Sequence, residues 1–121
     1  MNTVLLVEDD TFLIDIYTTK LEQDGFSVRV AKNGQEAFEL LKKEIPDILV
    51  LDIVLPQIDG WEVLSELKKN AQWKAIPVII LSNLGQKAEV KKGLDLGVQK
   101  YLIKAHYTPE EVVEEIKKIL K

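Results

Sequence analysis

The feature that most restricts the fold is a run of four apolar residues at 48–51, which stands between Asp47 and Asp52. A strand made only of apolar residues is buried on both faces, and such strands belong to the interior of parallel sheets. In open α/β sheets, ligands bind beyond the carboxyl ends of the strands. Asp52 therefore occupies a position where a functional site is expected.

Apolar strand patterns and amphipathic helix patterns alternate along the whole chain. Strands are predicted at 3–7, 26–31, 48–51, 76–81 and 100–103, and helices at 11–24, 35–44, 61–69, 86–96 and from Thr108 onward. Five strand–helix units predict an α/β fold, a (βα)₅ doubly wound parallel sheet with helices on both faces. The second strand alternates as Val28, Arg29 and Val30, so we place it at an edge, which gives the strand order 2-1-3-4-5.

Composition excludes several classes of protein. We expect one domain, 1–121, because no repeat, linker or low-complexity tract interrupts the chain. No apolar run approaches the roughly 18 residues of a membrane span, and the N-terminus lacks a signal-peptide pattern, so we expect a cytoplasmic protein without membrane insertion. With no cysteine and one histidine, His106, thiolate and histidine-built metal sites are not expected. The net charge of −4 argues against direct nucleic-acid binding.

Polar residues follow four of the five predicted strands. They are Glu8, Asp9 and Asp10 after the first, Asp52 after the third, Ser82 and Asn83 after the fourth, and Lys104 after the fifth. Carboxylates from adjacent strands would raise one another's pKa values unless a hard cation lay between them, and oxygen ligands suit Mg²⁺ or Mn²⁺. This cluster of carboxylates argues against a nucleotide-binding Rossmann domain or a flavodoxin, because both need backbone N–H groups or hydroxyls at this edge to bind an anion.

A bound cation would make this edge of the sheet attractive to an anion. Lys104 and the hydroxyl of Ser82 could hold the oxygens of a phosphoryl group. Asp52 could then act as a nucleophile and form an aspartyl phosphate, while the cation and Lys104 stabilise the transferring charge.

Five motifs in one order and spacing carry a family resemblance. They are Val-Glu-Asp-Asp at 7–10, Leu-Asp-Ile-Val-Leu-Pro at 51–56, Ile-Asp-Gly at 58–60, Leu-Ser at 81–82 and Tyr-Leu-Ile-Lys at 101–104. With them the chain resembles the receiver domain of bacterial two-component response regulators, the fold of chemotaxis regulators, over essentially all of 1–121. Each motif alone is common, whereas the five together are highly specific.

The resemblance implies a role for each residue that matches a family motif. Asp52 would be the phosphoacceptor, and Lys104 would contact the phosphoryl group. Asp9, Asp52 and the backbone carbonyl of Val54 would bind the Mg²⁺ or Mn²⁺ ion, with Glu8 acting on it through water.

The resemblance also implies a switch and its partners. Ser82 would move onto the phosphoryl group and Tyr101 would then turn inward. The donor would be the phosphohistidine of a sensor histidine kinase or a phosphotransfer protein, or acetyl phosphate. The domain would catalyse only its own phosphorylation and dephosphorylation, and a face made by the fourth helix, fifth strand and fifth helix would bind a downstream target protein. Because the chain ends just after its last helix, taken as complete it would signal by binding another protein.

Two positions depart from the family pattern. Ala105 stands where a proline usually follows the lysine. A cis bond before a non-proline residue costs about 2.5–4 kcal/mol, so we expect a trans bond, a different path for the following loop, 106–108, and a different orientation of Lys104. Asn83 stands where a very small residue is usual and could narrow access or hydrogen-bond the phosphoryl group. Val54 and Leu84 stand at the two positions that flank the attacking water in the family, and both are apolar here. This predicts slow self-dephosphorylation.

Two other functional classes remain as alternatives. A phosphohydrolase of the haloacid-dehalogenase type would need a second carboxylate two residues after the nucleophile, where Val54 stands. A pseudo-receiver would bind partners without phosphorylation, and the departures at Asn83 and Ala105 leave that possibility open. Lys87, Lys91 and Lys92 are expected to form a solvated helix face.

Overall fold

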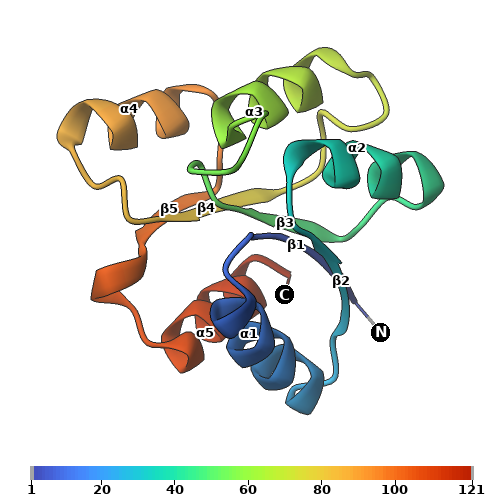
Figure 1. Ribbon diagram of the computed structural model, residues 1–121, viewed down its shortest axis with the longest axis vertical. Coiled ribbons are helices and arrows are strands. Elements are labelled where there is room, and N and C mark those ends of the chain that lie inside the picture. Colours follow the sequence, from blue (N-terminus) through green and yellow to red (C-terminus); the bar gives the residue numbers. More distant parts are fainter. Residues whose placement is uncertain (1, 121) are drawn as a thin grey trace.

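The computed structural model describes residues 2–120, and Figure 1 shows a central sheet with helices on both faces. The strands are β1 Thr3–Val7, β2 Ser27–Ala31, β3 Ile48–Leu51, β4 Val78–Ser82 and β5 Lys100–Ile103. The helices are α1 Thr11–Gln23, α2 Gly34–Lys43, α3 Gly60–Lys69, α4 Lys87–Asp95 and α5 Pro109–Leu120, and a short 3₁₀ segment, η1 Lys104–His106, follows β5. All strands pair in parallel in the order β2-β1-β3-β4-β5, so the predicted fold class and strand order are confirmed.

The sheet buries apolar side chains on both of its faces. Every residue of β3 and β4 is buried, as expected for interior strands. Alternate residues pack in opposite directions: Leu49 joins the core beneath α2 and α3, whereas Val50 joins the core beneath α1 and α5. Figure 1 shows these layers, with α2, α3 and α4 on one face and α1 and α5 on the other. The edge strand β2 is only half-buried over most of its length, which agrees with its alternating sequence.

The ends of several elements follow the capping residues in the sequence. Asp10 caps α1, since its side chain accepts hydrogen bonds from the N–H groups of Phe12 at 2.9 Å and Leu13 at 3.2 Å. Thr108 and Glu111 form a reciprocal capping box at the start of α5. The largest difference from prediction is β4, which begins at Val78 and not at 76, because the N–H of Ile76 is bound in a turn to the carbonyl of Trp73.

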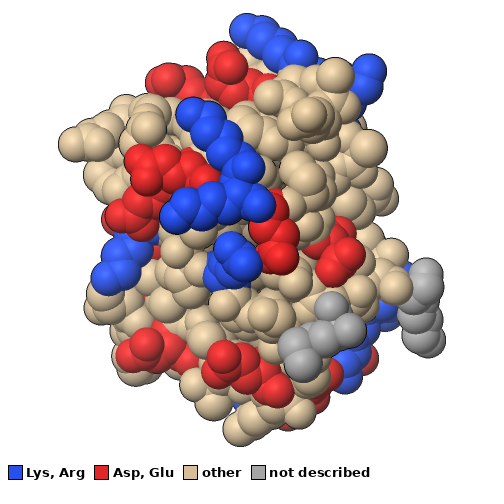
Figure 2. Space-filling model, turned by 90° about the vertical axis from the view of Figure 1, so that its right-hand side faces the viewer, with Lys and Arg blue, Asp and Glu red and all other residues tan. Residues whose placement is uncertain are grey.

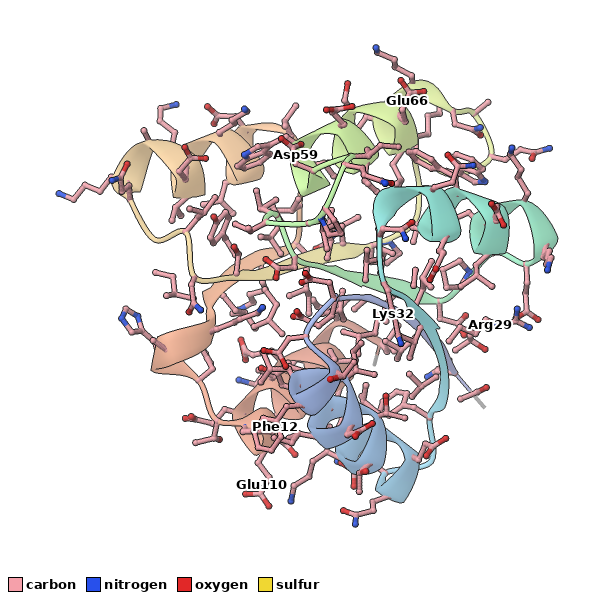
Figure 3. The ribbon with its side chains drawn as sticks, in the orientation of Figure 1. Phe12, Arg29, Lys32, Asp59, Glu66 and Glu110 are labelled. Atoms are coloured by element: carbon pink, nitrogen blue, oxygen red, sulfur yellow. The ribbon has the colours of Figure 1, made fainter. Side chains whose placement is uncertain are left out.

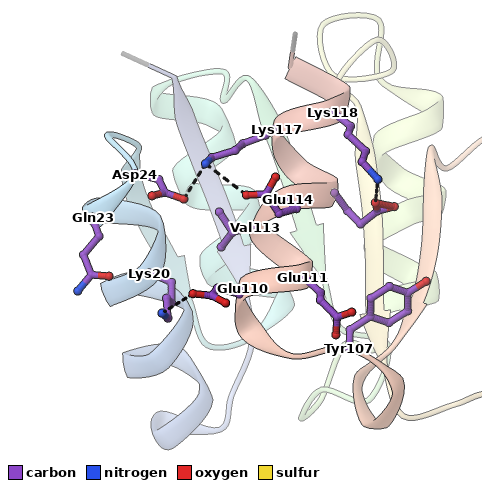
Figure 4. A pocket seen from close by; sticks show the side chains of 11 residues that line it. Lys20, Gln23, Asp24, Tyr107, Glu110, Glu111, Val113, Glu114, Lys117 and Lys118 are labelled. Carbon is purple, nitrogen blue, oxygen red and sulfur yellow. Dashed lines mark hydrogen bonds and ion pairs between the residues drawn. The ribbon is translucent and has the colours of Figure 1, made fainter.

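A surface hollow of about 460 Å³ lies between α1 and α5 (Figure 4). Ion pairs cross it from one helix to the other, joining Lys20 to Glu110 at 3.4 Å and Lys117 to Asp24 at 3.0 Å. Exposed pairs of this kind contribute little to stability. None of the predicted site residues lines this hollow, so it is a groove between two helices and not the site that the sequence predicts.

Acidic and basic side chains are interspersed on the face beside β2 (Figure 2). Arg29 of β2, for example, pairs with Glu44 at 2.8 Å. This face carries no broad basic surface of the kind that binds a phosphate backbone. Within residues 2–120, no helix has both the length and the apolar character needed to cross a bilayer.

Gly60 holds the start of α3 against the segment that follows β3. Its N–H donates a 2.8 Å hydrogen bond to the carbonyl of Ile53. A Cβ atom at residue 60 would lie only 2.4 Å from the carbonyl oxygen of Asp52 and 2.6 Å from the Cα of Ile53. Since both are backbone atoms, neither can move aside without displacing the segment that carries Asp52.

We therefore expect Gly60→Ala to destabilise the domain by about 1–3 kcal/mol, the usual cost of an overpacked site. Urea denaturation measures this change in the free energy of unfolding. Glu66→Ala, at an exposed position of the same helix, is the matched control and should change stability little. Equal stabilities of the two variants would contradict the close approach described here.

Candidate functional site

The carboxyl ends of β1, β3 and β5 bring most of the predicted site residues together. β1 and β3 are neighbours, and the N–H of Asp52 donates to the carbonyl of Val7 at 3.0 Å. A hollow of about 300 Å³ opens at this edge of the sheet. It is lined by Glu8, Asp9, Asp10, Leu13, Asp52, Val54, Asn83 and Lys104.

Buried polar side chains distinguish this edge of the sheet from the rest of the described surface. Among the described residues, the polar or charged residues that are buried are Glu8, Asp52 and Ser82. A buried charge is costly unless it is paired or binds a cation, so such residues rarely persist without a specific role. All three of these residues were singled out from the sequence as candidate site residues.

Lys104 holds the two buried carboxylates. Its Nζ atom lies 2.7 Å from Oδ2 of Asp52 and 2.6 Å from Oε1 of Glu8. The other oxygen of Asp52 accepts a hydrogen bond from the N–H of Val54 at 3.2 Å, and the other oxygen of Glu8 accepts one from the N–H of Asp10 at 3.1 Å. Each carboxylate oxygen of this pair therefore has a donor.

The same contacts govern protonation. Burial alone would lower the pKa of Lys104, but the hydrogen bonds and charges of Asp52 and Glu8 outweigh it, so the pKa of Lys104 is raised and the ammonium group stays charged. Burial raises the pKa of Glu8 above its ordinary value, although the Lys104 hydrogen bond and the Asp10 N–H act in the opposite direction.

Ala105 does not turn Lys104 away from the hollow. All peptide bonds of the described residues are trans, including Lys104–Ala105, as predicted from the absence of a proline. The loop that follows forms the single turn η1, and His106 is exposed there.

Ser82 and Tyr101 are both hydrogen-bonded to the backbone of Leu84, in the loop after β4. The hydroxyl of Ser82 is fully buried and accepts a hydrogen bond from the N–H of Leu84 at 3.3 Å. The hydroxyl of Tyr101 donates to the carbonyl of Leu84 at 2.5 Å. Ser82 does not line the hollow, whereas Asn83 does.

Residues 4–117 match the family described as the response regulator receiver domain. The chain belongs to this family. A Porphyra purpurea protein named "Probable transcriptional regulator ycf29" is 40% identical over 117 residues, which cover 97% of this chain and 56% of that protein. A Guillardia theta protein named "Probable transcriptional regulator ycf27" is 36% identical over 118 residues, covering 98% of this chain and 45% of that protein. The chain thus spans about half the length of the curated relatives it matches.

Solved receiver domains share the fold. The receiver domain of the Francisella response regulator 1452 superimposes with a TM-score of 0.90 at 32% identity, covering 99% of this chain and 97% of that one. The Mn²⁺-bound form of response regulator Rcp1 superimposes with a TM-score of 0.80 at 26% identity, covering 99% of this chain and 89% of that one. Membership in the family implies phosphorylation-dependent signalling in a two-component system.

The carboxylates of this receiver domain suit the divalent cation that receiver domains bind. Glu8, Asp9 and Asp52 each offer an oxygen, and these oxygens lie within 4.8 Å of one another. A donor set made only of oxygen atoms suits Mg²⁺ or Mn²⁺. The predicted contribution of the Val54 carbonyl and the water-mediated role of Glu8 stay predictions.

Sequence reasoning missed the role of the Leu84 backbone. The sequence singled out Leu84 only for its apolar side chain, whereas in the receiver domain its backbone N–H and carbonyl connect Ser82 to Tyr101. A backbone contact leaves no trace in residue identity, so no sequence signal could have revealed it.

Asp9 offers the cleanest test of the metal site, because it is exposed and its loss leaves the pairs around Lys104 intact. We expect Asp9→Asn to weaken Mg²⁺ binding roughly tenfold or more, since even outer-shell substitutions cost about 10–100-fold. Isothermal titration with MgCl₂ measures the affinity. Asp15→Asn removes the same charge from an exposed position of α1 and should bind Mg²⁺ like the wild type. Unchanged affinity in Asp9→Asn would exclude Asp9 as a ligand.

Proposed function

We propose that this receiver domain, over 1–121, is a phosphorylation-activated switch of a two-component phosphorelay. It accepts a phosphoryl group onto Asp52 in a Mg²⁺-dependent reaction and passes the signal on by binding another protein. The observation that carries this proposal is the buried Asp52 carboxylate, which lies 2.7 Å from the Lys104 ammonium at the edge of an acidic hollow. Phosphoryl transfer from a sensor kinase or phosphotransfer protein would take place in the cytoplasm, the location expected from the sequence.

The chemistry is a single displacement at phosphorus. The Asp52 carboxylate attacks the phosphorus atom, a P–O bond to Asp52 forms, and the bond from phosphorus to the donor atom breaks and leaves its electron pair on the donor. Lys104, which holds Asp52 and Glu8 beforehand, would transfer part of its hydrogen bonding to a phosphoryl oxygen. A bound Mg²⁺ ion, held by Asp9 and Asp52 with the Val54 carbonyl, would supply positive charge for the phosphoryl oxygens. The domain thus acts only on itself.

The phosphoryl group would be sensed through Ser82. Its hydroxyl now accepts a bond from the N–H of Leu84, and movement of Ser82 onto the phosphoryl group would break that bond. The carbonyl of the same residue is bound by Tyr101, so a displacement of the loop would reach the aromatic side chain. Tyr101 lies next to α4, which makes the face of α4, β5 and α5 the proposed binding surface for a target protein.

Intact mass spectrometry after incubation with acetyl phosphate and Mg²⁺ tests the proposal. We expect a gain of one phosphoryl group that requires Mg²⁺ and disappears in Asp52→Ala, whereas Asp15→Ala should be modified like the wild type. A wild-type protein that binds Mg²⁺ and gains no phosphoryl group, from acetyl phosphate or from a phosphorylated histidine phosphotransfer protein, would overturn it. That result would favour the pseudo-receiver.

The surface around the hollow suits a protein as the phosphoryl donor. Phe12 and Val54 are the most exposed of the large apolar residues in the described part of the chain, at 72% and 60%. Val54 lines the hollow, and Phe12 lies on the exposed first turn of α1, directly before Leu13, which also lines it (Figure 3). Exposed apolar side chains that flank a reactive group give a docking protein apolar area to bury.

We therefore expect Phe12→Ser to slow phosphoryl transfer from a histidine phosphotransfer protein several-fold, because buried aromatic anchors contribute about 1–2 kcal/mol or more to binding. Phosphorylation by acetyl phosphate should be unchanged, since a small donor needs no docking surface. Leu94→Ser removes an exposed apolar side chain from α4 and is the control. Equal loss with both donors would mean that Phe12 acts on the site and not on docking.

The apolar side chains of Val54 and Leu84 predict a long-lived aspartyl phosphate. Neither side chain can orient a water molecule for attack on phosphorus, and Val54 lies at the hollow. After the donor is removed, intact mass spectrometry over time measures the loss of the phosphoryl group. The loss should be slow in the wild type and faster in Val54→Asn, which adds a hydrogen-bonding group. Rapid loss in the wild type would refute this hypothesis.

A further inference from the structure

Helix α4 is held to the domain by fewer buried side chains than its neighbours. Of its residues only Gly93 is buried, whereas α1, α2, α3 and α5 each bury three or four residues. Its N-cap residue, Gln86, makes no side-chain capping hydrogen bond. Elements with few buried contacts open locally at a low free-energy cost. Each remaining contact of α4 therefore has a large influence on its position.

One of these contacts joins α4 to α3. The Nζ atom of Lys92 lies 4.4 Å from the centroid of the Trp61 ring. This geometry is a cation–π interaction, in which the electron-rich ring face attracts the ammonium group. From the sequence we expected Lys92 to be one of three solvated lysines, but unlike Lys91, which pairs with Asp95 on its own helix, it bridges two helices.

The two ends of this contact lie in different parts of the proposed switch. Trp61 follows Gly60, which is packed against the carbonyl oxygen of Asp52. Lys92 precedes Gly93, where a Cβ atom would lie 2.9 Å from the ring of Tyr101. The Lys92–Trp61 contact thus links the segment fixed around Asp52 to the helix that touches Tyr101.

We propose that the Lys92–Trp61 contact is a latch, which holds α4 against α3 while Lys104 is bound by Asp52 and Glu8. In the second half of this proposal, the latch is released when a phosphoryl group occupies the site. The first half depends only on the contacts of α4, whereas the second half rests on the proposed function. A ligand shifts a two-state equilibrium by its differential affinity for the two states, so weakening the latch should raise the apparent affinity for a phosphoryl mimic.

Hydrogen exchange without any ligand tests the first half. We expect Lys92→Gln to speed exchange of the α4 amides roughly two- to fivefold over the wild type. Loss of an exposed cation–π contact should shift the local opening equilibrium of α4 by this factor. Lys91→Gln removes the same charge from the same helix but loses only the exposed pair with Asp95, and it should exchange like the wild type. Equal α4 exchange in both variants would overturn the latch.

Calorimetric titration with beryllofluoride and Mg²⁺ tests the second half. Lys92→Gln and Trp61→Leu should each bind roughly two- to fivefold more tightly than the wild type, and the double variant should gain no more than either single variant because both remove one contact. Unchanged or weaker affinity in Lys92→Gln would overturn the coupling. A wild-type protein that does not bind beryllofluoride would instead count against the proposed function, while the exchange experiment would still decide the latch.

Discussion

The site depends on one buried positive charge between two buried carboxylates. Lys104 contacts Asp52 and Glu8 at 2.7 and 2.6 Å where both acids are almost completely removed from solvent. Without a cation, two buried acids so close together would take up protons or open the edge of the sheet to water. Lys104 therefore offsets part of the cost of burying the two acids and holds both carboxylates in position at the edge of the hollow.

The surrounding fold divides into a rigid part and a weakly held part. Strands β3 and β4 are buried throughout, and Gly60 leaves no space between α3 and the Asp52 segment. These contacts give Asp52 a stable position. Helix α4, in contrast, buries only Gly93 and borders the loop in which the backbone of Leu84 joins Ser82 to Tyr101. A change at the rigid Asp52 site can thus move α4, because α4 is the α-helix with the fewest buried residues to displace.

Much of this arrangement follows from local sequence patterns. Apolar runs predicted the interior strands, alternation in β2 predicted an edge, and the residues that end each strand predicted which side chains would meet. The start of β4 and the hydrogen bonds of Leu84 could not be predicted in this way, because both depend on where backbone groups find partners in the folded chain. The Lys92–Trp61 contact was missed for a related reason: the two residues belong to different helices and their spacing carries no periodic signal.

The sequence by itself determined the fold class, the strand order and the group of acids, lysine and serine at the strand ends, because hydrophobic periodicity and right-handed connections leave few topologies open. Only the tertiary structure decided how these groups pair. It directs Lys104 to two carboxylates at once, turns Ser82 toward Leu84 and leaves Asn83 facing the hollow. The physical reason is that side-chain pairing depends on distances and burial across different elements, which no single stretch of sequence contains.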